Sequence, residues 1–385
     1  MKLMLVIRTL GMGGMEHSTV KLANYWAAGG WDVSILVLTT NPVFFELHPA
    51  VTLLTSNFFE LDAPRMRRPI AWLLDRKARM TRLRAILRAQ HPDAIIACWG
   101  DSNVVSLLAT IGLNIPVIVT ERTSAQNAVC QPYDTLRHWL YPRAARVVVL
   151  HEAMQRQFSK RIQANTTVIP NSVVLPDETP EEAEYHTVKA QRSDKWLMAM
   201  GRLVELKRFD ELIRAFAGVA PAHPEWNLVI WGDGPEKEAL EALALELGVA
   251  ARVRLAGKTR EPIKEMRKVD LFALTSRFEG FSNVLGEAVG CGVASISYDC
   301  PCGPDVIIQH EINGLLVPDG DFEGLKSALS RMMSDDAFRK VCAAHGPEIL
   351  VRYSMKSVMQ QWEQVIARIV KPGVAAEIDV RDGDV

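Results

Sequence analysis

The sequence predicts an α/β protein made of two doubly wound domains, each with its own parallel sheet, that face each other across a cleft. Three observations support this prediction. The chain has 385 residues, which is more than a single hydrophobic core usually organises. Short β-branched runs alternate with longer helical patterns in both halves, as in successive βαβ units. A polar, acidic, proline-containing stretch at 177–193 separates the two halves.

The first domain is expected to cover residues 1–178. Apolar, β-branched runs bounded by turn residues predict its strands, near 3–7, 33–38, 94–98, 117–120, 146–150 and 167–169. Apolar residues at helical spacing predict its helices, at 16–28, 71–89 and 152–160. The alternation of the two patterns predicts a parallel sheet covered by crossover helices.

After a linker at 179–194, a second domain of the same class is expected at 195–352. Its strands are predicted near 196–200, 227–231, 253–256, 271–274, 294–297 and 315–317. Its helices are predicted near 209–219, 235–247, 284–290 and 322–332, with a further helix at 354–370. The acidic tail, 372–385, is expected to be disordered.

Composition excludes several classes of protein. The chain is 48% hydrophobic and 23% charged, which is close to an average globular protein and far from a disordered one. Its six cysteines are too few for a disulfide framework and predict reduced thiols in a cytosol. The apolar N-terminal run is interrupted by Arg8, and no run is long enough to span a membrane. An integral membrane protein is therefore not expected.

Charge is distributed unevenly along the chain. Residues 1–176 carry 19 basic and 11 acidic side chains, whereas residues 177–385 carry 25 and 34. The positive excess is concentrated at 65–88, where apolar residues are interspersed at helical spacing. A basic amphipathic helix of this kind predicts contact with anionic lipid headgroups. The alternative is a solvated helix packed on its own sheet. Nucleic-acid binding is not expected, because no reading motif with interleaved aromatic residues is present.

A glycine-rich loop, Gly11-Met12-Gly13-Gly14, follows the first predicted strand. Glycines allow backbone amides to approach a phosphate or sugar at a helix N-terminus, so Gly13 and Gly14 are candidate ligand contacts. A dinucleotide fingerprint would need glycine at position 16, where the chain has Glu16. The second strand ends at Thr39-Thr40, without an acidic residue for a ribose. The loop therefore disfavours a nicotinamide or flavin enzyme.

Three other stretches resemble phosphate or metal sites only in part. Gly257-Lys258-Thr259 ends like a P-loop, but Arg252 occupies the position of the first glycine. Asp319-Gly320-Asp321 has the form of some metal sites, but its context is that of an ordinary turn and helix start. Cys300-Pro301-Cys302 lacks the second Cys or His pair of a zinc site. Structural roles are expected for all three, and no metal site is expected.

The second half carries stronger signals at the ends of two predicted strands. Gly201, Arg202 and Lys207 follow the first strand of that half, where a guanidinium and an ammonium group would neutralise a diphosphate. Glu279 and Glu287 lie eight residues apart around a helix start. The helix's amides would face an anion, and the carboxylates would accept hydroxyl groups. A ligand with both phosphates and many hydroxyls, such as a nucleotide sugar, suits this combination.

Together these motifs resemble the GT-B glycosyltransferases of family 4. The resemblance covers essentially the whole chain, because the motifs follow the family's order and spacing. The motifs are the Gly11–Gly14 loop, Gly201-Arg202-Leu203 with Lys207, Gly232-Asp233-Gly234-Pro235-Glu236, the Glu279/Glu287 pair and Asn313-Gly314-Leu315-Leu316-Val317-Pro318.

The resemblance implies that residues 1–178 bind an acceptor and residues 195–352 bind a nucleotide-sugar donor. It implies retaining transfer of a hexose or N-acetylhexosamine from a UDP-sugar, without a metal or other cofactor. Arg202, Lys207 and Glu279 are the implied catalytic residues. The implied donor-binding residues are Gly13, Gly14, Gly201, Gly280, Phe281, Ser282, Asn283 and Glu287. The last helix, within 353–371, is implied to cross back to the first domain.

The acceptor side departs from the family pattern. Many relatives have a histidine after the fourth strand, where this chain has Arg122. A guanidinium cannot act as a neutral base, so either Arg122 binds an anionic acceptor or Glu121 supplies the base. His17 is a further candidate for acceptor contact.

The stretch Tyr298–Asp305 is similar to a subgroup of bacterial enzymes that extend polyprenyl-diphosphate-linked glycans. This similarity implies a lipid-linked acceptor and a cytoplasmic protein held peripherally on the inner face of the membrane. The alternative function is that of a nucleotide-sugar epimerase or hydrolase with a related fold, which would need paired acid and base groups.

Overall fold

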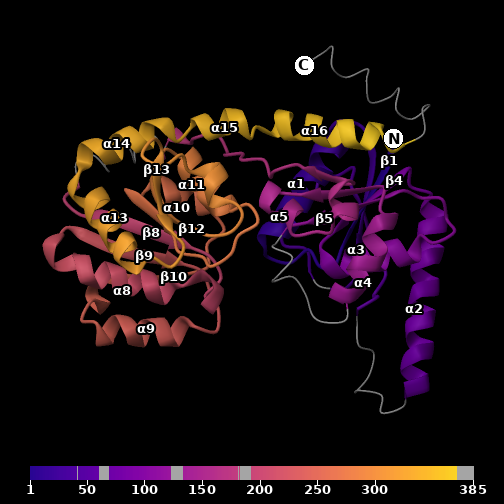
Figure 1. Cartoon of the computed structure of the whole chain (residues 1–385), viewed down its shortest axis with the longest axis horizontal. Coiled ribbons are helices and arrows are strands. Elements are labelled where there is room, and N and C mark those ends of the chain that lie inside the picture. Colours follow the sequence, from indigo (N-terminus) through magenta and orange to yellow (C-terminus); the bar gives the residue numbers. More distant parts are fainter. Residues whose placement is uncertain (41, 60–68, 123–132, 181, 183–191, 371–385) are drawn as a thin grey trace. The chain divides into compact units, whose positions relative to one another are not determined.

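A computed structural model describes residues 1–40, 42–59, 69–122, 133–180, 182 and 192–370, with only the backbone described at 69–74 and 133–135. The chain forms two compact units (Figure 1). Unit 1 comprises Met1–Pro170 and Val358–Val385, and unit 2 comprises Asn171–Ser357. The division thus falls eight residues before the boundary expected from the sequence, and the expected linker at 179–194 belongs to unit 2.

Unit 1 is built around a seven-stranded parallel sheet in the order β3-β2-β1-β4-β5-β6-β7. Its strands are β1 (Lys2–Ile7), β2 (Asp32–Val37), β3 (Thr52–Thr55), β4 (Ala94–Cys98), β5 (Val117–Glu121), β6 (Arg146–Val149) and β7 (Thr166–Val168). Its helices are α1 (Gly14–Ala28), α2 (Pro69–Gln90), α3 (Gly100–Ala109), α4 (Tyr133–Leu140), η1 (Tyr141–Arg143), α5 (Glu152–Arg156) and α6 (Lys160–Gln163). The order reverses between β1 and β4, which is where open α/β sheets bind ligands.

Unit 2 has a six-stranded parallel sheet in the order β10-β9-β8-β11-β12-β13. Its strands are β8 (Lys195–Met200), β9 (Trp226–Trp231), β10 (Val253–Gly257), β11 (Leu271–Leu274), β12 (Ala294–Asp299) and β13 (Gly314–Pro318). Its helices are η2 (Glu205–Lys207), α8 (Phe209–Val219), η3 (Ala220–Ala222), α9 (Lys237–Glu246), η4 (Ala250–Arg252), α10 (Pro262–Arg267), α11 (Asn283–Gly290), α12 (Pro304–Ile307), α13 (Phe322–Ser334), α14 (Asp336–His345) and α15 (Glu348–Arg352). Here the order reverses between β8 and β11.

Both sheets are buried, as their apolar sequences require. Every residue of β4 and of β11 is buried, because crossover helices cover both faces of a parallel sheet. In unit 2, the apolar face of α8 packs into the core through residues such as Leu212, Ile213 and Phe216, which have no exposed surface. This predicted alternation of buried strands and helices is confirmed in each unit.

The last helix, α16 (Met355–Ala367), begins in unit 2 and ends in unit 1. Its Trp362 is 2% exposed and meets Trp26 of α1 edge to face, with ring centroids 6.2 Å apart. An aromatic pair of this geometry stabilises more than its buried area alone implies. The C-terminal helix is therefore an integral part of the unit 1 core.

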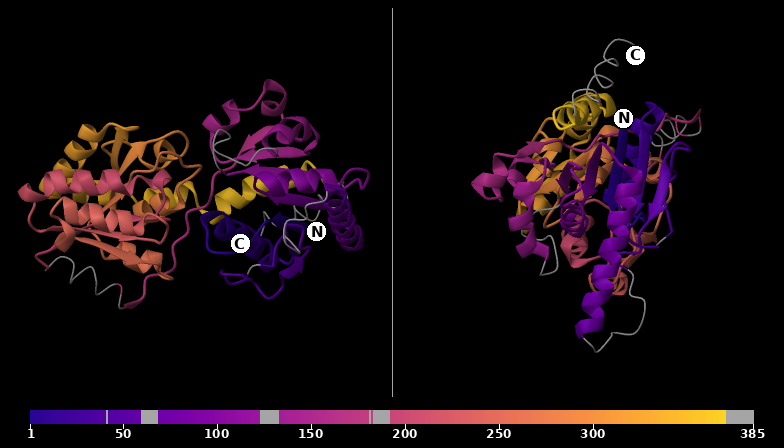
Figure 2. Two further views of the ribbon diagram at one scale, coloured as in Figure 1. Left: turned by 90° about the horizontal axis from the view of Figure 1, so that it is seen from below. Right: turned by 90° about the vertical axis from the view of Figure 1, so that its right-hand side faces the viewer.

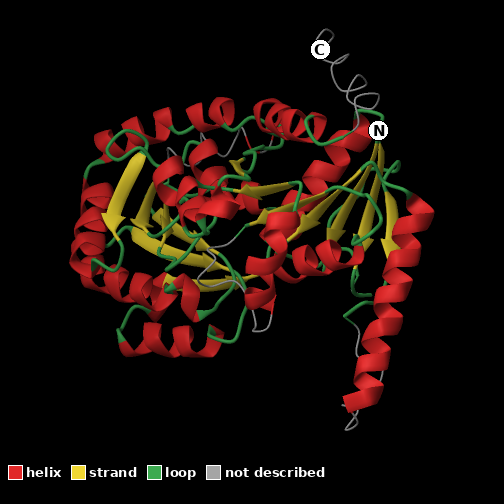
Figure 3. Cartoon of the chain, turned by 45° about the vertical axis from the view of Figure 1, so that its right-hand side comes forward, coloured by secondary structure: helices red, strands yellow, loops and turns green. Residues whose placement is uncertain are grey.

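The basic stretch predicted at 71–89 is helix α2, which extends beyond the strands of its own unit (Figures 2 and 3). Arg65, Arg67 and Arg68, which precede this helix in the basic stretch 65–88, lie outside the described residues. Within the described parts of the chain, no helix has the length and apolar character to cross a lipid bilayer.

Candidate functional site

The candidate donor site lies at the carboxyl edge of the unit 2 sheet. Because β8 and β11 are adjacent in this sheet, the loops that follow them meet at the position where the strand order reverses. The loop after β8 contains Gly201, Arg202 and Lys207, and the loop after β11 contains Glu279. The fold thus brings together two motifs that are more than seventy residues apart in the sequence.

Glycines bring two backbone segments, 201–203 and 231–234, into close contact at this edge. The Gly201 amide donates to the Trp231 carbonyl at 2.9 Å, and the Leu203 amide donates to the Asp233 carbonyl at 3.0 Å. Gly232 has a φ of 149°, and a Cβ there would lie 1.8 Å from the Gly201 oxygen. The glycines of the 232–236 motif are therefore required by packing, since any side chain would displace the Gly201 loop.

Lys207 and Glu279 form the centre of the site. The Lys207 Nζ lies 2.6 Å from Glu279 Oε1, and the two side chains are 20% and 12% exposed. The Lys207 backbone is fixed because its carbonyl accepts a hydrogen bond from Thr275 Oγ1 at 2.8 Å. The next residue, Arg208, is left-handed at φ 48° and starts α8. The ammonium group is thus held in place beside a carboxylate, at the carboxyl edge of the sheet.

Arg202 directly follows Gly201 and is exposed. Its position at the end of β8 places a second positive charge on the loop that holds Lys207. The structure therefore puts both predicted diphosphate-binding cations on one loop, with Lys207 paired and half-buried and Arg202 open to solvent.

The loop from Gly280 leads into α11 and provides the predicted anion-binding amides. Ser282 is 2% exposed, and its Oγ has no hydrogen-bond partner among the described residues. Ser282 occupies the N-cap position of α11, but its side chain makes no capping hydrogen bond. Phe281 is buried against Tyr353, with ring centroids 5.3 Å apart, so its ring anchors the loop.

Glu287 lies one turn into α11 and four residues after Asn283, so the two side chains share a helix face. Both are partly buried, and Asn283 Oδ1 accepts a hydrogen bond from Asn171 Nδ2 at 2.9 Å. Glu287 is therefore placed on the same short helix whose N-terminus carries the Ser282 hydroxyl.

The Cys300-Pro301-Cys302 loop packs behind this site, which sequence reasoning did not anticipate. Burial, and then the negative charges of Glu279 and Asp319, raise the pKa of the Cys300 thiol to about 12. A Cβ on Gly303, at φ 120°, would lie 3.4 Å from the Gly280 carbonyl oxygen. The loop thus supports the backbone of the Glu279–Phe281 segment, and its thiols are buried.

The Asp319-Gly320-Asp321 turn has the expected structural role. Asp321 accepts a hydrogen bond from the Gly324 amide at 2.9 Å and caps α13. Asp319 pairs with Arg208 at 2.7 Å, and Gly320 has the positive φ that the turn needs. Both carboxylates are therefore used within unit 2.

In unit 1, the Gly13-Gly14 loop forms the N-terminus of α1. His17, in the first turn, stacks on Phe45 with ring centroids 4.8 Å apart. Burial, aided by the charge of Lys21, lowers the pKa of His17 to about 4, so its imidazole is neutral at physiological pH. At this pKa the imidazole is a weak base, but its neutral ring can accept a hydrogen bond from an acceptor hydroxyl, which keeps His17 a candidate for acceptor contact.

Glu121, a predicted acceptor-side residue, is buried and bonded to side chains of its own unit. Its side chain is 1% exposed, accepts a hydrogen bond from the Tyr141 hydroxyl and lies 3.6 Å from Arg137. Burial raises the pKa of Glu121 in spite of this positive charge. Glu121 is enclosed in this geometry, so the structure does not present it to an acceptor. Arg122 is also buried, at 7% exposed, and burial lowers its pKa.

Sequence reasoning missed a charged pair at the carboxyl edge of the unit 1 sheet. Arg8, after β1, lies 2.8 Å from Asp101, which is 7% exposed and follows β4. Trp99, between β4 and α3, has a φ of 81°, a rare conformation for an aromatic residue. Arg8 follows β1 directly and Asp101 lies at the start of α3, just after β4, so both come from the ends of the two strands where the strand order reverses. Their place at these strand ends was the signal available in the sequence.

Two family models match the chain. The model for glycosyl transferases group 1 matches residues 182–348, and that for the glycosyl transferase 4-like domain matches residues 13–172. Similar proteins include the lipopolysaccharide 1,6-galactosyltransferase of Escherichia coli K12, which is 30% identical over 65% of this chain and 68% of that protein. The chain also matches the exopolysaccharide phosphotransferase of Streptomyces coelicolor at 35% identity, but this match spans 52% of the chain and only 21% of that protein.

A further relative is similar over nearly its whole length. It is the Campylobacter jejuni transferase that adds α-1,4-linked N-acetyl-D-galactosamine to a GalNAc-GalNAc-diNAcBac-PP-undecaprenol, and it is 25% identical over 96% of this chain and 99% of its own. Among solved structures, Anabaena HepE in complex with UDP and glucose covers 95% of this chain with a TM-score of 0.77 at 19% identity. The chain belongs to the group 1, family 4-type glycosyltransferases and has their GT-B architecture of two Rossmann-like domains.

Proposed function

We propose that this glycosyltransferase transfers a hexose or N-acetylhexosamine from a UDP-sugar to a polyprenyl-diphosphate-linked saccharide, with retention of configuration and without a metal. The observation that carries the proposal is the Lys207–Glu279 pair at the strand-order reversal of unit 2. A positive and a negative group meet there beside a helix N-terminus. This combination suits a donor that carries phosphates at one end and sugar hydroxyls at the other.

In the proposed reaction, negative charge develops on the diphosphate as its bond to the sugar breaks. Lys207 and Arg202 stabilise that charge, which is the task a metal ion performs in other transferases. Glu279 orients the sugar through its hydroxyls, and Glu287 accepts the ribose hydroxyls. Because Lys207 is positioned before the donor binds, little reorganisation is needed during the reaction.

The proposed donor and acceptor classes are supported by the similar proteins. HepE was solved with UDP and glucose, and the Campylobacter relative acts on an undecaprenyl-diphosphate-linked glycan. A lipid-linked acceptor in turn supports a cytoplasmic protein held peripherally on the membrane. The alternative, an epimerase or hydrolase of nucleotide sugars, would release UDP or change the sugar without an acceptor.

Calorimetric titration tests the donor site. UDP is expected to bind more tightly than GDP or NAD. Its affinity should be unchanged in EDTA, because cationic side chains take the role of a metal. Glu287→Ala is expected to weaken UDP binding by about tenfold, since a ribose contact worth about 1.4 kcal/mol is lost. Glu246→Ala, an exposed carboxylate on α9, serves as the control. Unchanged UDP affinity in Glu287→Ala would remove that residue from the ribose, and UDP-sugar hydrolysis without an acceptor would favour the alternative.

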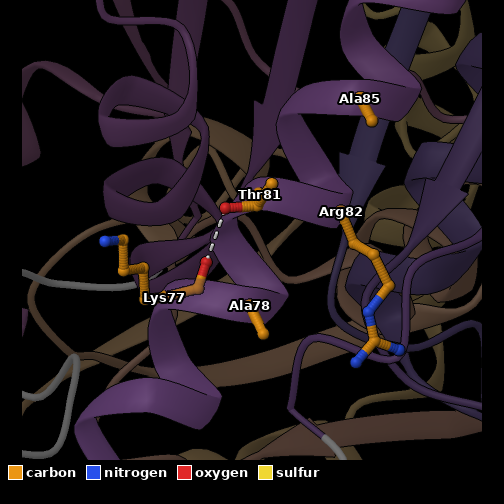
Figure 4. A pocket seen from close by; sticks show the side chains of 5 residues that line it. All are labelled: Lys77, Ala78, Thr81, Arg82 and Ala85. Carbon is orange, nitrogen blue, oxygen red and sulfur yellow. Dashed lines mark hydrogen bonds between the residues drawn. The ribbon is translucent and has the colours of Figure 1, made fainter.

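The proposed membrane contact of α2 is electrostatic. Leu83 and Leu87 are 1% exposed and face the unit's interior, whereas Arg76, Lys77 and Arg82 are exposed. Figure 4 shows Lys77 and Arg82 extending to either side of an open depression of about 510 Å³ whose other lining residues are Ala78, Thr81 and Ala85. The described surface of the helix therefore attracts anions, and its large apolar side chains, such as Met80 and Ile86, are at most partly exposed.

Two arginines of α2 hold the helix in place instead. Arg79 is 8% exposed, bonds Asp75 at 2.8 Å and donates to the Phe58 carbonyl at 3.2 Å. Arg84 donates to the carbonyls of Ala109 and Ile111, both at 2.8 Å. Arg79 and Arg84 are thus structural, and a test of membrane binding must leave them unchanged.

Replacing the exposed cations of α2 with glutamine (Arg76, Lys77, Arg82 and Arg88) is expected to lower binding to anionic vesicles by roughly 10²–10³-fold at low salt. Each cation near the membrane surface contributes about 1 kcal/mol to the binding free energy, and the four contributions are lost together. Co-sedimentation with vesicles containing phosphatidylglycerol measures the effect. A control with the same charge change replaces four exposed cations of unit 2, Arg254, Arg260, Arg352 and Lys356. Equal binding by both variants would refute a specific role of α2.

A further inference from the structure

An exposed tryptophan on α4 is not explained by the donor or acceptor sites. Trp139 is 79% exposed, and Leu136, one turn earlier on the same helix, is 38% exposed. Large aromatic side chains are usually buried or placed at interfaces, because each removes a large apolar area from water when covered. Trp139 is the most exposed of the large apolar side chains that the structure describes in unit 1, and Leu136 lies beside it on the same helix.

The orientation of Trp139 is fixed by the opposite face of its helix. Arg137 is 4% exposed and lies over the Phe158 ring at 5.6 Å, while Leu140 is 8% exposed. Tyr141, in η1, packs against the same Phe158 with ring centroids 6.0 Å apart. Rotating α4 to bury Trp139 would therefore expose a buried guanidinium and its neighbours, so Trp139 is held outward.

Exposed basic residues lie on η1, which contacts α4, and on α6, which contacts η1. Arg143 of η1 and Lys160 and Arg161 of α6 are exposed, and η1 packs against α6. Among the described side chains from 136 to 165, the acidic residue is Glu152, which pairs with Arg156 at 3.0 Å. The surface made of Leu136, Trp139, Arg143, Lys160 and Arg161, called here the Trp139 surface, therefore has an apolar centre and a net positive rim.

We propose that the Trp139 surface docks on an anionic phospholipid membrane, with Trp139 and Leu136 inserted at the level of the headgroups. Tryptophan prefers the membrane–water interface, where its ring is covered and its N–H stays hydrated, and cations beside it contact lipid phosphates. This surface supplies a more exposed large apolar side chain than the described face of α2 does. The inference extends the proposed membrane location and does not depend on which sugar is transferred.

Charge decides between lipid and a protein partner. A protein partner would have to present acidic side chains opposite each cation of this rim, whereas an anionic membrane presents negative charge across its whole surface. Here three cations, Arg143, Lys160 and Arg161, lie on η1 and α6, and the acid among the described side chains from 136 to 165, Glu152, is paired with Arg156. This net positive charge matches a uniformly anionic surface. A second copy of the chain is not favoured, because its Trp139 surface would carry the same charge.

Vesicle binding by the full chain tests the proposal. Trp139→Ala is expected to lower partition into phosphatidylglycerol-containing vesicles about tenfold, through loss of a buried apolar side chain. Arg143, Lys160 and Arg161 replaced together by glutamine should lower it by roughly 10²-fold, at about fivefold for each charge. Leu245→Ala removes an equally isolated apolar side chain, 73% exposed on α9, and should leave binding unchanged.

A direct readout locates the indole. Phospholipids brominated near the headgroup should quench part of the tryptophan fluorescence of the bound protein. Trp139→Phe should still bind vesicles but should lack the quenched part of the fluorescence. Equal quenching in wild type and Trp139→Phe, or vesicle binding unaffected by Trp139→Ala, would overturn the proposal. A wild-type dimer in sedimentation equilibrium that Trp139→Ala converts to a monomer would also overturn it.

The same variants separate this inference from the proposed function. Trp139→Ala lies outside the donor site, so UDP affinity and transfer to a water-soluble acceptor should equal those of the wild type. If vesicle binding falls and UDP binding is retained, the Trp139 surface is a lipid contact. If UDP fails to bind the wild type while Trp139→Ala still weakens vesicle binding, the proposal of a UDP-sugar donor is refuted. The proposal that the Trp139 surface contacts lipid is then still supported.

Discussion

Replacing Lys207 with alanine is expected to lower kcat by at least about 10²-fold and to leave the fold intact. The ammonium group lies 2.6 Å from Glu279, and the Lys207 backbone carbonyl accepts a hydrogen bond from Thr275. A positioned positive charge at the leaving group stabilises the transition state, and removing one such partner typically costs about 2.7–4 kcal/mol. The effect should fall mainly on kcat, because the charge develops as the sugar–phosphate bond breaks.

A matched lysine provides the control for this prediction. Lys258 also pairs with a carboxylate, Asp233, at 2.9 Å, but its side chain is 60% exposed. Lys258→Ala is expected to change kcat by less than about twofold, since an exposed ion pair contributes little. Thermal unfolding of both variants checks the fold. Wild-type turnover in Lys207→Ala would exclude Lys207 from catalysis, whereas partial activity in Lys207→Arg would indicate that charge alone is partly sufficient.

The parallel sheets could be predicted because buried strands leave a simple pattern. β4 and β11 are continuous apolar runs, and the structure places them near the predicted residues. β3 and α3 were missed for opposite physical reasons. β3 is a four-residue edge strand that is mostly exposed, and α3 is buried on nearly all sides and so lacks an amphipathic stripe.

The sequence was sufficient to identify which loops form the donor site. Glycines and charges that follow successive strands indicate the carboxyl edge of a parallel sheet, and Lys207 and Glu279 meet there as that rule implies. The enclosure of Glu121 was not predictable, because it depends on Arg137 and Tyr141, whose contacts are set by packing of α4 and η1. The same holds for Cys300, since nothing in its spacing places it behind Glu279.

Charge patterning predicted the basic helix but not the role of each cation. Arg79 and Arg82 are three residues apart on α2, yet Arg79 is 8% exposed and bonds backbone carbonyls while Arg82 is exposed. Sequence spacing gives the relative angle of two side chains around a helix, but not which of them faces the domain. The structure therefore reduces the candidate membrane contact to one face of the helix.

Replacing Arg202 with alanine is expected to lower kcat/KM by about 10²-fold. More of this loss should come from a higher KM, and less from a lower kcat, than in Lys207→Ala. Arg202 is exposed and follows Gly201 directly, so its guanidinium can bind the diphosphate of the donor in the ground state as well as in the transition state. Lys207 is held by protein contacts, whereas Arg202 is exposed to solvent. The loss of kcat/KM should therefore appear mainly as weaker donor binding in Arg202→Ala and mainly as slower turnover in Lys207→Ala.

The double variant tests whether both cations act on the same charge. If Arg202 and Lys207 neutralise one diphosphate, the loss in Arg202→Ala/Lys207→Ala should be smaller than the product of the single losses, since groups that act as a unit are not additive. Arg214→Ala, on α8, serves as the control cation. Initial rates over a range of UDP-sugar concentrations give KM and kcat separately. Strictly multiplicative losses would mean that the two cations stabilise different groups, and Lys207 alone would then remain the partner of the leaving diphosphate.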